Sequence, residues 1–193
     1  MRSDRPPTPG KLIALEGSAA ALLTNGCRKL AAANKTGRAA AGVSRWDASG
    51  IFFEMGMRAS GAGVPSPKTL MLLHAADLSF RLRWELGPLL DQGRHVVAAP
   101  YVESYIALGK AFGVSRRWLA DLFRFAPPAA ESYRIEEPAS VPGNRQSLRS
   151  YLDNSVDLLN GESLVWDPAR VRAQVLAYLD ALERRGGCRR LPA

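Results

Sequence analysis

The segment of this sequence that is most able to bind a ligand is a short apolar run that ends in a glycine and leads into a helix-forming segment. The run covers residues 11–16 and ends in Glu16; Gly17 follows, and residues 18–25 lead into the helical segment. In α/β proteins a junction of this kind binds phosphate, because the first turn of the helix presents free amide groups and a partial positive charge. The junction is therefore a candidate phosphate-binding site.

Metal and disulfide chemistry are not indicated. The two cysteines, Cys27 and Cys188, are far apart in the sequence and do not form a CxxC pair, and there are only two histidines. This content predicts neither a disulfide framework nor a metal site, and it is typical of a reducing compartment. We expect no bound metal and a cytoplasmic location.

The basic charge of the chain raises nucleic-acid binding as a hypothesis. There are 26 Lys and Arg against 18 Asp and Glu, which gives a net charge of +8 and a pI near 10.0. However, residues 1–10 carry a net +1 and residues 183–193 a net +3, and aromatic side chains do not alternate with basic ones as they do on single-strand binding surfaces. The charge therefore indicates a solvated, arginine-rich surface, and we expect no nucleic-acid partner.

The length and composition indicate one domain. The 193 residues, 47% of them hydrophobic, suffice for one full core but are few for two. No uncharged apolar stretch approaches the roughly 18 residues of a membrane span, and residues 1–10 hold Arg, Asp and three prolines where a signal peptide would be apolar. We expect a soluble domain over residues 11–186 with flexible segments at 1–10 and 187–193, and no contact with a membrane.

The elements that must position the junction follow from the hydrophobic pattern. Strands are predicted at residues 11–16, 39–45 and 95–99, with weaker candidates at 132–136 and 163–166. Longer segments of helical period separate them. This alternation is typical of a parallel sheet flanked by helices.

Two helices have clear boundaries. One is predicted over Lys68–Arg83, after the capping pair Ser66-Pro67, and it has more apolar positions than one sheet face can cover. The excess predicts a second contact, and we expect a homodimer through this helix. The last helix is predicted to begin after the capping pair Asp167-Pro168 and to stop at Gly186.

Four segments resemble thymidylate kinase, a nucleoside monophosphate kinase of the P-loop class. That family opens with a strand, Glu-Gly and a glycine-rich loop ending in Gly-Lys-Ser/Thr, and residues 16–24 are similar to this opening. Residues 72–78 look like its Leu-Leu-Phe-Ala-Ala-Asp-Arg helix, residues 87–93 like its Pro-Ala-Leu-x-x-Gly turn, and residues 96–104 like its Val-Ile-Ala-Asp-Arg-Tyr-x-x-Ser strand end. The resemblance covers most of residues 11–125. It implies a three-layer α/β fold of the P-loop NTPase type with a parallel sheet of about five strands, phosphoryl transfer from ATP with magnesium, and a homodimer.

The loop departs from the family pattern. Ala20 and Leu22 stand at glycine positions and Leu23 at the lysine position, while Thr24 keeps the place of the magnesium-binding hydroxyl. A Cβ obstructs close approach of backbone to phosphate, and each missing charged hydrogen bond costs about 1.5–3 kcal/mol. Residues 19–23 are also good helix formers, so we expect the helix to begin early and fill the phosphate site.

Other charged positions of the family are lost as well. Its substrate-holding arginine is Leu78 here, its Asp-Arg pair is Ala99-Pro100, and its base-stacking phenylalanine is His74. Phosphoryl transfer depends on positioning and on neutralising charge, and one arginine can be worth about 10³–10⁵ in rate. Conventional kinase catalysis is therefore not expected.

Several side chains remain candidates for nucleotide binding, because they lie in or near the resembling segments: Arg45, His74, Asp77, Tyr101 and Ser104. Each also has an ordinary structural interpretation, such as a hydrogen-bonded helix histidine, a capping carboxylate or a strand-end surface charge. Arg145 and Arg149 lie near the place of the family's arginine-bearing lid and are further candidates for an anion contact.

Three functional hypotheses follow. The first is a degenerate thymidylate kinase-like protein without conventional ATP-dependent phosphotransfer and without a cofactor, which acts as a binding or interaction protein. The second is an active nucleotide kinase that converts dTMP to dTDP with ATP and magnesium through a rearranged site. The third is binding of a nucleoside monophosphate without transfer.

Overall fold

The computed structural model describes residues 10–58, 63–137 and 150–193. Within them, five strands form one sheet in the order β2-β3-β1-β4-β5, and every neighbouring pair is parallel. The strands are β1 (Leu12–Glu16), β2 (Gly42–Arg45), β3 (Val96–Ala99), β4 (Glu131–Ile135) and β5 (Arg189–Leu191). The predicted parallel sheet of about five strands is confirmed.

The centre of the sheet is the centre of the core. All residues of β1 and β3 are buried, as expected for central strands of a parallel sheet that is covered on both faces. Leu12 lies opposite Val96 on one side of β1, and Ile13 lies opposite Glu131 on the other. This register brings the carboxyl ends of β1, β3 and β4 to one edge of the sheet.

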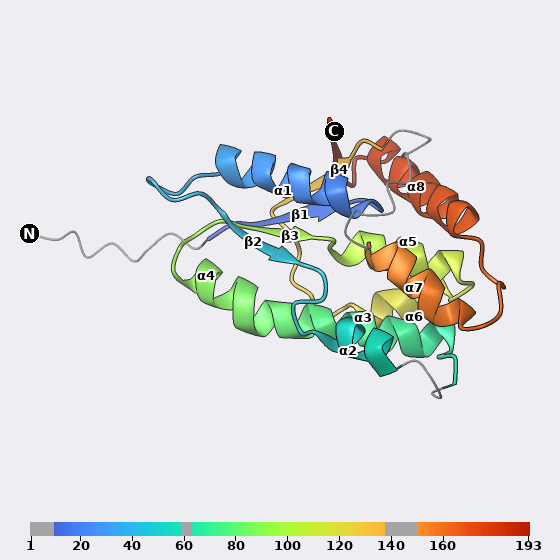
Figure 1. Ribbon diagram of the computed structural model, residues 1–193. Helices are drawn as coiled ribbons and strands as arrows, with labels where there is room; N and C mark the ends of the chain where they lie inside the picture. The colour runs from blue at the N-terminus through green and yellow to red at the C-terminus, as the bar shows by residue number, and fades with distance from the viewer. Residues whose placement is uncertain (1–9, 59–62, 138–149) are drawn as a thin grey trace, which may run out of the picture.

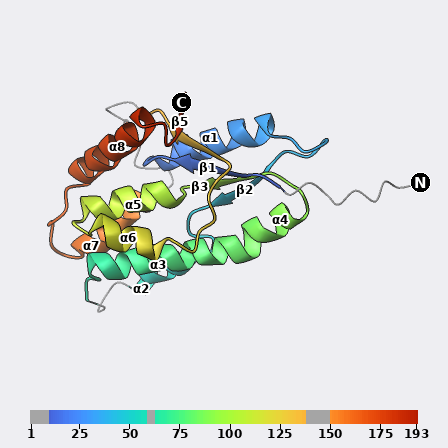
Figure 2. The ribbon, with the colours of Figure 1, turned by 180° about the vertical axis from the view of Figure 1, so that it is seen from behind.

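Helices cover both faces and the carboxyl edge of the sheet. They are α1 (Ala20–Ala33), α2 (Ile51–Arg58), α3 (Pro67–Arg81), the π-helical turn η1 (Leu82–Leu86), α4 (Gly87–Asp91), α5 (Val102–Ala111), α6 (Arg116–Leu122), α7 (Tyr151–Asn160) and α8 (Pro168–Arg184). In Figure 1, α1 lies above the sheet, and α3, η1 and α4 form one continuous rod below it. The view from behind in Figure 2 shows the same layers, with α5 to α8 grouped beyond the carboxyl ends of the strands.

The predicted helix boundaries are largely confirmed. The Ser66 hydroxyl accepts a hydrogen bond from the Thr69 backbone at 3.1 Å, and the Asp167 carboxylate accepts one from the Ala169 backbone at 3.0 Å. Gly186 follows α8 with a φ of +75°, a backbone conformation that favours glycine. The helix predicted to end near Arg83 instead continues through η1 to Asp91.

Two expectations about the carboxyl-terminal part are wrong. Residues 163–166 form no strand: the Asn160 side chain binds the backbone N–H and C=O of Trp166 and closes this segment as a loop. The segment 187–193, expected to be flexible, contains β5, which pairs with β4. Two of the three residues of β5 are arginines, so the hydrophobic pattern did not predict this edge strand. Arg190 forms ion pairs with Glu136 and Glu183.

Two further observations concern the ends of the chain and its helices. Residues 1–9 of the expected flexible amino-terminal segment lie outside the described residues. Of the helices in the described ranges, none is both long and apolar enough to cross a membrane.

The pairing of β5 predicts a stabilising role for the last residues. We expect deletion of residues 188–193 to lower the thermal unfolding midpoint by roughly 4–8 °C, because about 2 kcal/mol of edge-strand pairing and ion pairing is lost and each kcal/mol corresponds to about 2–4 °C at this size. Deletion of Pro192 and Ala193 alone is the control and should leave the midpoint nearly unchanged. Equal midpoints for the two deletions, measured by circular dichroism, would show that β5 contributes nothing.

Candidate functional site

The carboxylate at the end of β1 binds the amino-terminal end of α5. Glu16 is buried and accepts hydrogen bonds from the backbone N–H groups of Tyr101, Glu103 and Ser104 at 3.0–3.3 Å, and from the Ser104 hydroxyl at 2.5 Å. An anion is favourable here because the first turn of a helix has free amides and a partial positive charge. Burial raises the pKa of Glu16 to about 7, and the nearby Glu103 carboxylate acts in the same direction. The Glu16 carboxylate and the Ser104 hydroxyl therefore already have hydrogen-bond partners within the protein.

The expected phosphate-binding junction is also occupied by a side chain of the protein. The Glu137 carboxylate accepts hydrogen bonds from the backbone N–H groups of Ser18 and Ala19 and from the Ser18 hydroxyl. Gly17 leaves room for two neighbouring side chains, because a Cβ at this residue would lie 2.5 Å from the Ile135 Cγ2 atom and 2.8 Å from the Glu137 Oε1 atom. An internal anion thus lies at the amino-terminal end of α1, where a phosphate would be expected to bind.

The first turn of α1 confirms the expected early helix start. α1 begins at Ala20, and Ala19 is its extended capping residue. Leu23, at the family's lysine position, is buried, and Leu22 packs against the core. These residues therefore form the first turn of a helix, where the family pattern has an open, glycine-rich loop.

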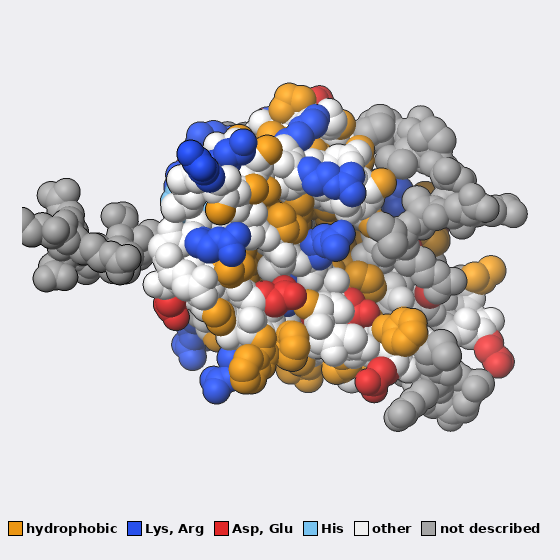
Figure 3. Space-filling view, turned by 60° about the vertical axis from the view of Figure 1, so that its left-hand side comes forward, with side chains coloured by type: hydrophobic (Ala, Val, Ile, Leu, Met, Phe, Trp, Pro, Cys, Tyr) orange, Lys and Arg blue, Asp and Glu red, His pale blue; other side chains and the backbone are white. Residues whose placement is uncertain are grey.

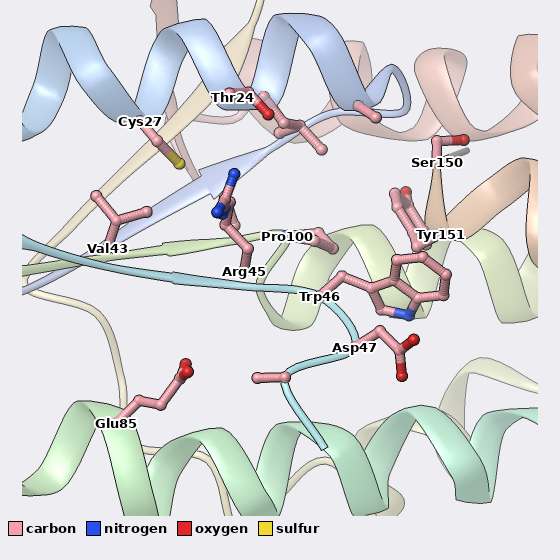
Figure 4. Close-up of a pocket in the computed structure, with 14 residues that line it drawn as sticks. Thr24, Cys27, Val43, Arg45, Trp46, Asp47, Glu85, Pro100, Ser150 and Tyr151 are labelled. Atoms are coloured by element: carbon pink, nitrogen blue, oxygen red, sulfur yellow. The ribbon is translucent and has the colours of Figure 1, made fainter. Parts of the chain in front are cut away.

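A cavity of about 510 Å³ opens beside this junction, between α1, β2, η1 and α7 (Figure 4). Its walls come from five segments that are distant in sequence: Ala20, Leu23, Thr24 and Cys27; Val43, Arg45, Trp46, Asp47 and Ala48; Glu85; Ala99 and Pro100; and Ser150 and Tyr151. In Figure 3, Lys and Arg side chains surround a hollow with hydrophobic side chains in its floor. Burial raises the pKa of the Cys27 thiol to about 11, so this thiol stays protonated and is a poor nucleophile.

Arg45 supplies the positive charge of the cavity. It lies at the end of β2, is exposed, and makes no hydrogen bond or ion pair with any residue in the described ranges. Figure 4 shows its guanidinium directed toward α1, with Glu85 on the opposite wall. The walls are partly apolar and include the Asp47 and Glu85 carboxylates, and the guanidinium can hold a carboxylate or a phosphate whose remaining body is apolar.

Asp77 shapes the turn that carries this arginine. It is fully buried on α3 and accepts hydrogen bonds from the Asp47 backbone at 3.1 Å and from the backbone and hydroxyl of Ser49 at 3.0 and 2.8 Å. Asp47 has a positive φ of 60°, and its own carboxylate binds the Phe52 and Phe53 backbone N–H groups at the start of α2. Asp77, which stands at the place of the family's aspartate, therefore stabilises the conformation of the turn after β2.

His74 lies in the core and does not line the cavity. Its imidazole is within 4.5 Å of the Phe52 ring and 4.9 Å of the Tyr105 ring, measured between centroids, and its Nε2 lies 2.8 Å from the Ser155 hydroxyl. It has no exposed surface, and burial lowers its pKa to about 3. The base-stacking position of the family is thus covered here by the protein's own aromatic rings.

The remaining candidates are Tyr101 and the two arginines of the expected lid. The Tyr101 hydroxyl donates to the Pro127 carbonyl at 2.7 Å. Arg145 and Arg149 lie outside the described residues. Among the residues that are described, no three His, Cys, Asp or Glu side chains lie together as a group that could hold a metal ion.

Two charged residues near the site were not found from the sequence. Arg81 is fully buried and binds the Ser44 hydroxyl and carbonyl, the Pro100 carbonyl and the Tyr105 hydroxyl at 2.9–3.1 Å. It lies three residues after Leu78, on the same face of the helix, and this spacing could have drawn attention to it. The signal for Glu137 was weaker, since it is only an acidic residue after a predicted strand.

The buried Glu16 and His74 predict opposite effects of pH on stability. The pKa of Glu16 is raised in the folded state, so its contribution to the free energy of unfolding falls as the pH rises from about 4.5 to 7. The pKa of His74 is lowered, so its contribution rises as the pH rises from about 3 to 6.5. Between pH 4.5 and 6.5 the two effects oppose each other in the wild type.

Single variants should separate these effects in urea unfolding at a series of pH values. We expect Glu16→Gln to be more destabilised, relative to wild type, at pH 4.5 than at pH 7, by on the order of 3 kcal/mol. We expect His74→Phe to gain stability relative to wild type as the pH falls below 6.5. If the free energy of unfolding of both variants changed with pH in parallel with that of the wild type, the pKa shifts assigned to Glu16 and His74 would be wrong.

Comparison with known proteins identifies the fold. No protein-family model matches the chain, and no curated protein sequence is significantly similar to it. Among solved structures, the crystal structure of thymidylate kinase from Ehrlichia chaffeensis matches with a TM-score of 0.63 and 12% sequence identity, covering 96% of this chain and 93% of that one. The chain therefore has the thymidylate kinase-like α/β fold of the P-loop NTPase type, with a five-stranded parallel sheet flanked by helices.

Proposed function

We propose that the protein is a binding protein with this fold that does not transfer phosphoryl groups from ATP. The observation that carries the proposal is the Glu137 carboxylate on the Ser18 and Ala19 amides. A triphosphate placed there would meet a negative charge, with a repulsion of about 1 kcal/mol at 4 Å in water and about 4 kcal/mol near a protein surface. It would also lose the donors that Glu137 already uses.

The residues around the junction support the same proposal. Leu23 replaces the lysine of the resembling loop and is buried, and Leu78, at the place of the substrate-holding arginine, is buried as well. Ala99 and Pro100 line the cavity without a charge where the family pattern has Asp-Arg. Charge neutralisation, which phosphoryl transfer requires, is therefore missing at several positions together.

The proposed ligand is a small anion with an aromatic or apolar body, such as a nucleoside monophosphate. Arg45 is an available cation on a cavity of about 510 Å³, a volume typical of small-molecule sites. The similar solved structure is a thymidylate kinase, which makes dTMP the first ligand to test. Thr24 lies in the same cavity as Arg45, and this supports ATP-dependent phosphorylation of dTMP as the alternative.

Thermal-shift and kinase assays together test this proposal. We expect dTMP to raise the unfolding midpoint of the wild type and magnesium-ATP to leave it unchanged. At a dTMP concentration of 100 times the dissociation constant, the free energy of unfolding should rise by about 2.7 kcal/mol. Arg45→Gln should abolish the dTMP shift, whereas Arg28→Gln, an exposed α1 residue outside the cavity wall, should keep it.

ADP formation distinguishes binding from catalysis. We expect no ADP from ATP and dTMP above the level of a Thr24→Ala control. Formation of ADP above that level would establish the kinase alternative. A protein that is not stabilised by dTMP and forms no ADP would leave the interaction-protein hypothesis without a nucleotide ligand.

We also propose that two copies associate through the face of α3 and η1. Leu70, Met71 and Leu78 are fully buried inside the chain, but Leu72, Phe80 and Trp84 remain 51%, 38% and 62% exposed. The intervals of eight and four residues place these three on one side of the continuous helix. Such large exposed apolar side chains are unfavourable in water unless a partner covers them.

Sedimentation velocity tests the association. We expect a dimer for the wild type and a monomer for Phe80→Glu/Trp84→Glu. The control is Leu164→Glu/Val165→Glu, which introduces the same two negative charges at side chains that are 95% and 71% exposed in the loop before α8, and it should leave the dimer intact. A monomeric wild type at micromolar concentration would overturn the proposed dimer.

A further inference from the structure

A second hollow lies between α5 and α8, away from the cavity beside α1. The two helices pack side by side in both ribbon views (Figures 1 and 2). Residues of both helices line a hollow of about 480 Å³, which we call the groove. Small side chains line it on both helices, namely Ala107, Ala111, Ala177 and Ala181. The groove therefore allows another backbone to approach closely.

Three basic side chains border this groove without acidic partners. Lys110, Arg116 and Arg185 line it, and none of them forms an ion pair with a residue in the described parts of the chain. By contrast, Arg172 on the same helix α8 pairs with Asp153 at 3.0 Å. No Asp or Glu lines the groove, so it presents one sign of charge.

Tyr178 lines the same groove as the three cations. The Lys110 Nζ atom lies 4.8 Å from the centre of its ring. Burial and the Glu103 carboxylate, which accepts the Tyr178 hydroxyl at 2.7 Å, raise the pKa of Tyr178, while Arg116 and Arg185 act in the opposite direction. Glu103 is therefore the acidic group facing the cations from α5, and it is engaged by the tyrosine.

We propose that the groove between α5 and α8 docks an acidic amphipathic helix of another protein. Carboxylates on this helix pair with Lys110, Arg116 and Arg185, and its small apolar face packs on the alanines. The complementary charge determines the orientation and accelerates association, and the apolar contact contributes burial. This interaction goes beyond ligand binding in the cavity, because it uses a different surface of the molecule.

A protein helix suits the groove better than a nucleic acid does. Single-stranded nucleic acids stack their bases on exposed aromatic rings, but the one aromatic residue that lines this groove, Tyr178, has a lysine over its ring and a carboxylate on its hydroxyl.

Fluorescence anisotropy tests the proposal with a labelled peptide of about 20 residues, in which Glu and Ala repeat at helical spacing. We expect the folded full-length protein to bind this peptide. Arg116→Glu/Arg185→Glu should weaken binding at least tenfold. The matched control, Arg117→Glu/Arg184→Glu, changes the adjacent exposed residues by the same charge and should stay within twofold of wild type.

Each other outcome overturns the proposal. Absence of binding, or equal losses for the two double variants, would mean that the groove is not a docking site. Equal affinity for a scrambled peptide of the same composition would mean that it does not recognise a helix. Tighter binding of a single-stranded oligonucleotide, with the same loss in Arg116→Glu/Arg185→Glu, would make it a nucleic-acid surface.

Discussion

The free amides at the start of α1 need an anion, and in this protein the anion is the carboxylate of Glu137. This single interaction joins the end of β4 to the β1–α1 junction, beside Gly17, where a Cβ would lie 2.5 Å from the Ile135 Cγ2 atom and 2.8 Å from the Glu137 Oε1 atom. In a phosphate-binding protein the same amides stay free until a ligand arrives. Here the chain satisfies them itself, so α1 is complete without a nucleotide.

The same principle recurs along the carboxyl edge of the sheet. Glu16 satisfies the amino-terminal end of α5 and Asp47 that of α2, while Asp77 holds the turn that carries Asp47. Even the buried cation Arg81 has neutral oxygen acceptors from β2, β3 and α5 around it. Arg45 differs, because it reaches the cavity and has no partner among the described residues. Arg45 is therefore the cation of the cavity that remains available to an anion under the proposed function.

Local signals in the sequence were sufficient for much of the fold. The central strands are near-continuous apolar runs, and the caps at Ser66 and Asp167 act within three residues, so both can be recognised without knowledge of the tertiary structure. The early start of α1 also followed from its alanines and leucines. By contrast, β5 is only three residues long, and it is a strand because it pairs with β4, which no local pattern encodes.

The residues that decide the chemistry of the site were harder to predict, because their roles depend on contacts across the fold. Glu137 reaches Ser18 over 119 positions of the sequence, and Arg81 reaches Ser44 over 37. The resemblance to the kinase pattern indicates that a lysine and two glycines are missing at the junction, but only the folded chain shows that Glu137 binds the amides there. The substitution and the internal carboxylate act in the same direction: Leu23 provides no cation at the junction, and Glu137 already accepts hydrogen bonds from its amides.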